Sequence, residues 1–432
     1  MNGSAASGEG DGRTHGLWAR TAPPLEVGRL REPISVEVLV MGGGFTGLSA
    51  ALHLSERGIP VAVLEAAHIG FGGSGRNVGL VNAGLWLEPD RVVELLGVPH
   101  GERLIELLGD APQAVFDIIR RFDIACEGVR NGTLHCAVGA RGREEIERRF
   151  KQWQARAAPV EILSAAQSAA LLGTGLYTGA LLDRRAGTIQ PLAYVRGLAK
   201  AARSAGAQIF AESAVERIER RASGWSAITA QGSVAARWVV VATDVYATGP
   251  WQQVAREQIR LPYFNVATRP LPSSLAESIL PQRQGCWDTQ TVLKSFRMDA
   301  AGRLVFGSVG ALRGTGTAVH RAWAKRSIRK LFPQIGELEL EHEWYGSIGM
   351  TSDNVPRFHK LADHVIAVSG YNGRGIAPGT VFGRVIADYI CGNLDDGGLP
   401  LPVTAVSEPR FRALREAAYE LGSQAVHLMS AT

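Results

Sequence analysis

The 432-residue chain has few cysteines, and their spacing excludes two common kinds of stabilising site. They form no CxxC pair and no cluster with histidines at zinc-ligand spacing; they are Cys126, Cys136, Cys286 and Cys391. We therefore expect neither a disulfide framework nor a metal site. Free thiols are typical of a reducing compartment, so we expect a cytoplasmic protein.

Long apolar runs are also missing. The most apolar long window, residues 35–54, contains Glu37 and four glycines, and its hydrophobic period changes partway. A membrane span would be continuously apolar, so we expect none. Residues 1–16 are small, polar and glycine-rich, without the apolar segment of a signal peptide, and we expect them to form a flexible tail.

Lysine is scarce, because only six of the 46 basic residues are lysines, which leaves 46 − 6 = 40 arginines. The formal net charge of +5 suggests an anionic partner, but the arginines are scattered, often beside acids, and form no basic block. Binding to nucleic acid is therefore not expected. A basic groove for an anionic ligand and plain solubility both remain open as explanations.

Glycine, by contrast, is abundant. Its 51 residues are 51/432, or about 12% of the chain, against a usual share of roughly 7%. No Gly-X-Y repeat occurs, which excludes a collagen-like chain. The surplus indicates either many turns with positive φ or backbone that lies close to a ligand. The length of the chain suggests two or three domains.

A strand–helix–strand pattern lies near the N-terminus. The β-rich run 35–41 precedes a glycine-rich turn and a helical segment over 48–57. A second strand over 61–64 ends on Glu65. This order is typical of the first unit of a dinucleotide-binding domain.

The turn itself has the GxGxxG spacing. Gly42 permits the tight bend, Gly44 admits a pyrophosphate, and Gly47 lets helix and strand pack closely. The phosphate would lie on the helix N-terminus, where free amides favour an anion, and Glu65 would accept hydrogen bonds from ribose hydroxyls. The acid argues against NADP but does not separate NAD from FAD.

A second glycine-rich loop follows directly, over residues 66–82. It carries Ser74, Arg76 and Asn77, where an NAD domain would usually enter another helix. Backbone amides and polar side chains here could contact a second face of a longer cofactor, which favours FAD. A flexible loop without a ligand is the alternative.

With these two loops the sequence resembles the D-amino-acid oxidase superfamily of FAD-dependent amine and amino-acid oxidoreductases. Within it, the bacterial gamma-glutamylputrescine oxidase-like branch is most similar. The resemblance runs from about residue 17 to 388 and is carried by segments 17–24, 42–47 with Glu65, 73–77, 187–194, 238–243, 296–297, 302–307, 344–356 and 370–377.

The resemblance implies a fold of mixed α/β and α+β class. A Rossmann-like FAD-binding domain would be built from the discontinuous segments 17–82, 187–250 and 344–400. Residues 83–186 and 251–343 would form an antiparallel-sheet substrate-binding domain. We expect residues 401–432 to form a C-terminal amphipathic helix that docks or dimerises, so a homo-oligomer stays open.

The resemblance also implies the residues that hold FAD. Relatives that bind FAD covalently through histidine place it in the early glycine loop, where this chain has Arg76 and Asn77, so we expect non-covalent FAD. The expected cofactor-binding residues are Gly42, Gly43, Gly44, Phe45, Thr46, Gly47, Glu65, Ala66, Gly73, Ser74, Gly75, Arg76, Asn77, Val215, Ala242, Thr243, Gly373, Arg374, Gly375 and Ile376.

Three cations are candidates for catalytic roles. Arg297 matches a strand arginine that pairs with a substrate carboxylate in amino-acid-oxidising relatives, although a structural salt bridge is the alternative. Lys294 matches a lysine that some relatives use in oxygen activation. Strand alternation puts the two on opposite faces, and we favour Arg297 in the pocket. Arg374 could stabilise negative charge on the reduced flavin or be a surface residue.

Aromatic residues supply the candidates for the substrate pocket. Tyr371, Trp287 and Tyr263 are expected there, with burial in the core as the alternative. The branch usually has serine and histidine where this chain has Asn372 and Arg374, so the exact substrate is not carried over.

The expected reaction is oxidation of a small amine or amino acid, with a hydride passing to flavin N5 and the imine then hydrolysed. No second nucleotide-binding unit occurs, so oxygen or an electron carrier is the expected electron acceptor. An NAD-linked dehydrogenase and a flavin-binding subunit of a larger dehydrogenase are the alternatives.

Overall fold

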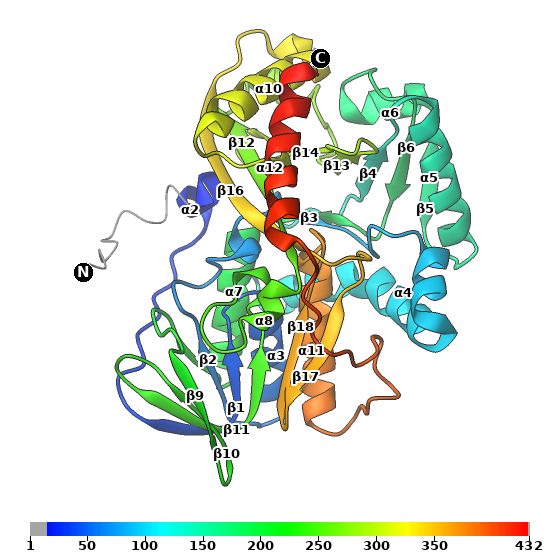
Figure 1. The fold of residues 1–432 in the computed structure, drawn as a ribbon. Coiled ribbons are helices and arrows are strands. Elements are labelled where there is room, and N and C mark those ends of the chain that lie inside the picture. The colour runs from blue at the N-terminus through cyan, green and yellow to red at the C-terminus, as the bar shows by residue number, and fades with distance from the viewer. Residues whose placement is uncertain (1–14, 431–432) are drawn as a thin grey trace.

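The computed structural model describes residues 15–430, which form two large sheets with helices around them (Figure 1). The first sheet runs in the order β17-β18-β11-β1-β2-β8, and β9 and β10 extend it from β11. Its strands are β1 (Ile34–Met41), β2 (Val61–Leu64), β8 (Gln208–Phe210), β9 (Arg217–Arg221), β10 (Gly224–Ile228), β11 (Ser233–Val241), β17 (Arg357–Ala362) and β18 (Val365–Ser369).

The central strands of this sheet are parallel, and both of their faces are buried. β1 pairs in parallel with β2 and β11, and β11 pairs in parallel with β18. Val38 and Val40 of β1 pack into the core that includes the helices, whereas Leu39 and Met41 pack into a second core on the opposite face. Continuous apolar strands of this kind are typical of covered parallel sheets.

Four helices supply most of the helical side chains in the core on one face of the first sheet. They are α3 (Phe45–Ser55), α4 (Pro89–Arg121), α7 (Pro191–Ser204) and α11 (Ile376–Ile390). The short helix α2 (Leu17–Thr21) contacts α7, and α8 (Gln253–Arg256) lies beside the short 3-10 helix over Asp244–Tyr246. Two further 3-10 turns span Gly73–Gly75 and Pro333–Ile335.

The second sheet runs in the order β16-β12-β15-β14-β13-β4-β6-β5 and lies in the upper half of Figure 1. Its strands are β4 (Thr133–Cys136), β5 (Val160–Leu163), β6 (Ala180–Asp183), β12 (Ile259–Thr268), β13 (Gly285–Asp288), β14 (Lys294–Met298), β15 (Leu304–Val309) and β16 (Leu340–Met350). A small third sheet pairs β3 (Leu80–Val81) with β7 (Gly187–Thr188).

The expected combination of a Rossmann-like sheet with a second, mainly antiparallel sheet is confirmed. One pair in the second sheet, β4 with β13, is parallel, and it joins two chain segments that are far apart in sequence. Around this sheet lie α5 (Gly139–Gln154), α6 (Ala165–Leu172), α9 (Ser273–Ala276) and α10 (Thr315–Leu331).

The elements do not follow the expected segment limits at every point. Strand β16 begins at Leu340 and pairs with β12 as far as Met350, so the segment beginning at 344 starts inside a strand of the second sheet. Helix α4 lies in the segment assigned to the substrate domain, yet it packs against α11 and α7 in the core of the first sheet. The domain limits stay a prediction.

The expected tail over residues 1–16 falls mostly outside the described residues. Its last two residues, however, are packed. His15 is fully buried and its Nε2 lies 3.1 Å from the carbonyl oxygen of Gly70, and a Cβ on Gly16 would clash with the indole of Trp344. Within 15–430, no helix is both long and apolar enough to span a bilayer.

The C-terminal helix α12 (Arg412–Met429) packs against β12 and α10. Its anchor is His427, whose Nδ1 lies 2.7 Å from Nδ1 of His320. The imidazole of His427 also stacks on Trp323, with ring centroids 3.7 Å apart. Because one histidine must donate and the other accept, this hydrogen bond needs at least one neutral imidazole.

We expect acid to loosen this helix. Burial lowers the pKa of His427 to about 3 and also lowers the pKa of His320, whose ordinary value is 6.5. The undocked histidines bind protons below about pH 6.5, whereas the docked ones resist protonation, so the stability that docking contributes is complete above pH 6.5 and falls between pH 6.5 and 3. Limited proteolysis across this range should show cleavage of α12 that increases as the pH falls.

The control is His427→Phe, which keeps an aromatic ring against Trp323 but cannot be protonated. The difference in cleavage between pH 7 and pH 5 should be smaller in this variant than in the wild type. An equal acid response in both proteins would contradict the prediction.

Candidate active site

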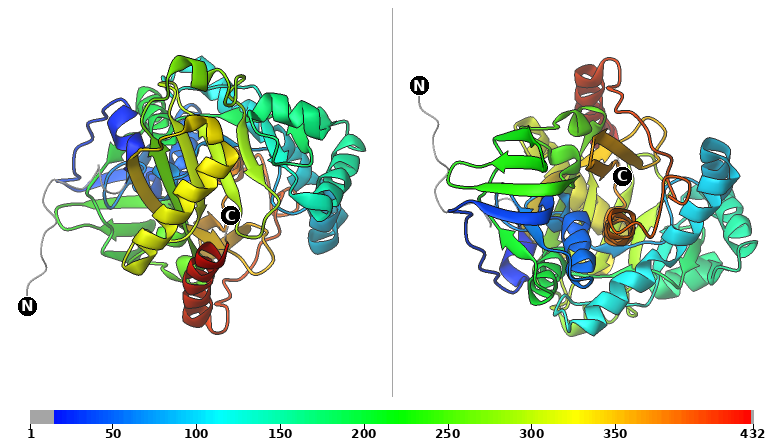
Figure 2. Two further views of the ribbon diagram at one scale, coloured as in Figure 1. Left: turned by 90° about the horizontal axis from the view of Figure 1, so that it is seen from above. Right: turned by 90° about the horizontal axis from the view of Figure 1, so that it is seen from below.

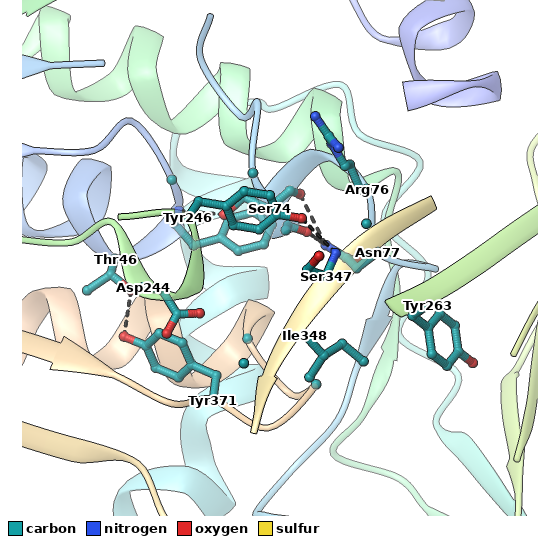
Figure 3. A pocket seen from close by; sticks show the side chains of 18 of the residues that line it. Thr46, Ser74, Arg76, Asn77, Asp244, Tyr246, Tyr263, Ser347, Ile348 and Tyr371 are labelled. Carbon is teal, nitrogen blue, oxygen red and sulfur yellow. Dashed lines mark hydrogen bonds between the residues drawn. The ribbon is translucent and has the colours of Figure 1, made fainter. Parts of the chain in front are cut away.

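A cavity of about 530 Å³ lies at the carboxyl ends of the parallel strands of the first sheet and extends under the second sheet (Figure 3). This volume falls within the range of ligand-binding sites. Carboxyl ends of parallel strands are where ligands usually bind in open α/β sheets. Residues from both sheets line it, including Met41 of β1 and Tyr263 of β12.

The first glycine loop has the close contacts that its spacing predicts. Gly42 has a φ of +109°, and a Cβ there would lie 2.7 Å from the carbonyl oxygen of Ala242. A Cβ on Gly44 would lie 2.9 Å from the hydroxyl of Ser74, inside the cavity lining. Gly47 does not line the cavity, because it packs against the backbone of Gly42. Helix α3 begins directly after Gly44, so its free amides face the cavity.

Glu65 closes the other side of this loop at the end of β2. Its Oε2 accepts the amide of Gly43 at 2.8 Å, and its Oε1 accepts the amide of Ala67 at 2.9 Å. Burial raises the pKa of Glu65, and these amides partly oppose that shift. The carboxylate therefore lies in the cavity wall with lone pairs that can accept ribose hydroxyls.

The second glycine loop meets the first at the helix N-terminus. The hydroxyl of Ser74 accepts the amide of Phe45, the first residue of α3, at 3.1 Å. The side chain of Asn77 donates to the carbonyl oxygens of Gly73 and Ser74 and accepts the amide of Gly79, which holds the loop in shape.

Arg76 projects from the same loop. Its Nε donates to the carbonyl oxygen of Phe71 at 2.8 Å, and its guanidinium lies over the rings of Phe71 and Tyr246. Gly73, Ser74, Arg76 and Asn77 line the cavity. Gly75 does not, because it is packed against the backbone of Gly70.

A third loop brings a second helix N-terminus to the cavity. Gly373, Gly375 and Ile376 line it, and α11 begins at Ile376. The hydroxyl of Tyr371 is hydrogen-bonded to Oγ1 of Thr46 on α3 at 2.6 Å, so the two helix ends are tied together (Figure 3).

Asn372, which departs from the pattern of the similar branch, has a defined structural role. It adopts a φ of +52°, a conformation that asparagine tolerates better than most residues. Its Oδ1 accepts the amide of Thr351 at 2.8 Å. Asn372, at the position where the similar branch usually has serine, therefore anchors the loop to the segment after β16.

Arg374 lies behind the cavity wall and does not line it. Its guanidinium lies 4.7 Å from the ring centroids of both Trp86 and Trp287, and its Nη1 donates to the carbonyl oxygen of Ala83 at 2.9 Å. It is buried, so the alternative of a surface residue does not apply. Burial lowers its pKa, and nearby Arg149 lowers it further. Trp86 and Trp287 line the cavity and Arg374 packs against them, so its role toward a flavin stays a prediction.

The structure also places Arg297 outside the cavity. Ser295 lines the cavity, and Arg297 lies two residues further along the same face of β14, about 7 Å beyond it. There its Nη2 pairs with Glu127 at 3.6 Å, and its guanidinium lies over the ring of Trp18. Burial lowers its pKa to about 10. The ion-pair alternative is the one that the geometry supports.

Lys294 faces the opposite side of the strand, as alternation predicts. Its Nζ lies 3.3 Å from Oδ2 of Asp288 and 6.0 Å from the ring centroid of Trp323. It does not line the cavity either. The three expected catalytic cations therefore all lie outside the space in which a substrate would bind.

The three expected substrate-side aromatic residues do line the cavity: they are Tyr371, Trp287 and Tyr263. Of the expected cofactor-binding residues, all line it except Gly47, Gly75 and Arg374.

Several lining residues were not predicted from the sequence. They include Trp86, Asp244, Tyr246, Ser347 and Ile348. The position of Asp244 just after β11 was a usable signal, because residues after parallel strands gather at the binding edge of the sheet. Burial raises its pKa, and its Oδ1 accepts the amide of Gly370 at 2.8 Å.

Comparison with known proteins identifies the family. Residues 37–389 match the family described as FAD dependent oxidoreductase (DAO). The chain belongs to this family. It is 31% identical over 370 residues to gamma-glutamylputrescine oxidoreductase from Escherichia coli (strain K12), covering 85% of this chain and 86% of that protein.

Two further relatives cover similar shares of the chain. The probable oxidoreductase OrdL of Haemophilus influenzae is 29% identical over 363 residues, covering 83% of each protein. The crystal structure of glycine oxidase from Geobacillus kaustophilus superposes with a TM-score of 0.67 at 20% identity, covering 87% of this chain and 99% of that one. This last likeness supports the fold.

The residues of this FAD-dependent oxidoreductase fit its cofactor. The cradle at Gly42 and Gly44 leaves no room for a side chain, and the amides of α3 can receive a pyrophosphate. Within residues 15–430, Oγ1 of Thr243 and Nη2 of Arg76 are buried in lining residues without a hydrogen-bond partner, so both can contact a polar ligand. FAD rather than NAD is therefore the cofactor, as expected.

The close approach at Gly44 generates a test of the cofactor site. Gly44→Val should abolish flavin binding, because its Cβ would meet the Ser74 hydroxyl where the pyrophosphate must pass. The measurement is the flavin absorbance of the purified protein relative to its absorbance at 280 nm. Gly28→Val is the matched control, because a Cβ on Gly28 meets nothing within 4 Å, and it should keep its flavin.

Acid precipitation tests whether the flavin is bound covalently. No histidine or cysteine lines the described cavity, so acid precipitation of the wild type should release all of the flavin into the supernatant. Flavin that stays with the precipitate would contradict non-covalent binding.

The position of Arg297 generates a second test. We expect Arg297→Met to leave the KM of a reacting substrate within about twofold of the wild type, because the side chain does not reach the cavity. Trp287→Ala removes a ring from the cavity wall and should raise KM about tenfold. Steady-state kinetics decide the matter, and a large rise in KM for Arg297→Met would restore its role as a carboxylate receptor.

Proposed function

We propose that this flavoprotein oxidises the C–N bond of a small amine that carries no carboxylate on the reacting carbon, in the manner of a gamma-glutamylputrescine oxidase. The observation that carries the proposal is that no lysine lines the described cavity and that its lining arginine, Arg76, lies over the rings of Phe71 and Tyr246. The similarity to an enzyme named for gamma-glutamylputrescine supports the same substrate class.

The part of the cavity under the second sheet is aromatic and apolar. Its walls include Tyr263, Trp287, Leu293 and Val309. The hydroxyl of Tyr263 is hydrogen-bonded to Oγ of Ser295 at 2.6 Å, which supplies a polar point on this wall. Such surroundings favour the neutral amine over the ammonium ion, and a neutral amine is the form that can lose a hydride.

Three charged residues line the described cavity, and none of them belongs to the wall formed by Tyr263, Trp287, Leu293 and Val309. Glu65 is an anion in the first loop, and Asp244 is an acid that accepts the amide of Gly370. Arg76 extends away from Tyr263 and lies over the rings of Phe71 and Tyr246 (Figure 3). A substrate carboxylate beside the reacting carbon would be buried without a partner, which costs several kcal/mol.

Bound FAD supplies the acceptor for the hydride. The chain's own residues orient the amine against the aromatic wall, exclude water and present the amides of the α11 N-terminus to developing negative charge. The amine loses a hydride and a proton to become an imine, and water hydrolyses the imine to a carbonyl compound and an amine or ammonia. Oxygen or an electron carrier then takes up the electrons.

The decisive experiment is anaerobic mixing of the purified enzyme with candidate substrates while flavin absorbance is followed. Gamma-glutamylputrescine or a simpler diamine should bleach the flavin, and glycine should react at least about 100-fold less efficiently, because its carboxylate would be buried unpaired. Faster bleaching by glycine would refute the proposed substrate class.

The same experiment separates the alternative of a flavin-binding subunit. Bleaching by an amine in the absence of any other protein would exclude a dependence on a partner for substrate oxidation. Re-exposure of the reduced enzyme to air, compared with addition of an artificial electron-accepting dye, then shows whether oxygen is the acceptor. The four cysteines are free and three are buried, which supports our proposal of a cytoplasmic location.

A further inference from the structure

Exposed apolar side chains on this molecule are concentrated at its C-terminal helix. Of the ten large hydrophobic residues that are exposed within the described chain, seven lie between residues 411 and 429. They are Phe411, Leu414, Tyr419, Leu421, Val426, Leu428 and Met429. Both views in Figure 2 place this helix, drawn in red, at the outer edge of the molecule. A concentration of this kind marks an interaction surface rather than scattered surface residues.

Helix α12 turns its polar face toward the rest of the molecule. Its inward face is polar: Glu420 pairs with Arg313, and Gln424 is hydrogen-bonded to Thr315 at 3.0 Å. His427 completes this face. Most surface helices bury their apolar face and expose the polar one. In α12 the apolar face is turned outward, so docking onto its own domain does not account for it.

The outward residues have the spacing of a helix-pairing seam. Leu414, Ala418, Leu421, Ala425 and Leu428 of α12 are all exposed, and they follow one another at intervals of four, three, four and three residues. This is the heptad pattern of two helices that pack side by side with a left-handed crossing. We call these five residues the α12 seam.

We propose that the α12 seam is a dimer interface that pairs with the same seam of a second copy of this chain, with the two helices antiparallel. The alternation of residue sizes carries the proposal. In an antiparallel pair centred between residues 419 and 420, Leu414 lies opposite Ala425 of the other copy, and Leu421 lies opposite Ala418. Each large side chain then faces a small one, which is the arrangement that fills an interface.

A parallel pair would lack this complementarity. It would place Ala418 against Ala418 and Ala425 against Ala425, which leaves gaps, and it would bring the Arg415 side chains of the two copies to the same end. In the antiparallel pair Arg415 instead lies near the uncharged stretch 422–429 of the other copy. The antiparallel orientation therefore avoids repulsion between like charges.

Charge also argues against a lipid surface as the occupant. Helix α12 contains two arginines and two glutamates, so its formal charge is 2 − 2 = 0 with neutral histidine. Helices that lie on anionic membranes usually carry an excess of lysine and arginine on their polar face.

The first test is the mass of the full-length holoenzyme by analytical ultracentrifugation across a range of concentrations. We expect a dimer for the wild type and a monomer with unchanged flavin content for Leu421→Glu. Leu421 is 66% exposed in the single chain, so the substitution should not disturb folding. Leu176→Glu is the matched control at an exposed leucine outside the helix, and it should remain dimeric.

The second test is the orientation of the helices. In a Cys391→Ser background, a mixture of Leu414→Cys and Ala425→Cys proteins should form a mixed disulfide, because these positions face each other in the antiparallel pair. Leu428→Cys alone should not cross-link, because its two copies lie about 25 Å apart along the helix axis. A disulfide formed by Leu428→Cys alone would overturn the antiparallel orientation.

A monomeric wild type would overturn the proposal. So would co-sedimentation with vesicles of phosphatidylcholine and phosphatidylglycerol that Leu421→Glu abolishes, because the surface would then bind lipid. A dimer that persists in Leu421→Glu would show that a different surface forms the interface.

Discussion

The close packing of α11 against α3 is the contact on which the site depends. Glycines make it possible, because a Cβ on Gly383 would clash with the side chain of Ser49, and a Cβ on Gly379 would lie 3.1 Å from Oγ1 of Thr46. The hydroxyl of Ser49 donates to the carbonyl oxygen of Thr380 at 2.6 Å across the same interface. Two helices that begin 331 residues apart in sequence therefore present both of their N-termini to one cavity.

This arrangement explains why the cavity has so few charged residues. Two sets of free backbone amides and their helix dipoles supply positive potential at the cofactor end, so arginine and lysine side chains are not needed there for a pyrophosphate. The other end of the cavity is formed by strands of the second sheet and is aromatic and apolar. The division between a polar cofactor end and an apolar substrate end follows from the meeting of two different kinds of sheet.

Two buried arginines, Arg374 and Arg297, lie outside the cavity and contact aromatic rings. Arg374 packs against two tryptophans of the cavity wall, and Arg297 lies over Trp18 and pairs with Glu127. Each guanidinium therefore packs against an aromatic ring and contacts at most a few polar atoms.

The sequence by itself determined the first nucleotide-binding unit, because its signals are local. The spacing of Gly42, Gly44 and Gly47 and the acid at Glu65 depend only on the order of one strand, one turn and one helix. The second loop at 73–77 and the aromatic residues of the cavity were also predicted, since the glycine loops were similar to those of a known family. These predictions needed no knowledge of how distant segments meet.

Only the tertiary structure decided where the long side chains lie. Alternation correctly placed Lys294 and Arg297 on opposite faces of β14, but it could not show that the cavity ends at Ser295. The inward polar face of α12 was equally hidden, because the heptad pattern is the same whether the apolar face is buried or exposed. Periodicity defines faces within one element, whereas the partner of each face is set by packing between elements that are distant in sequence.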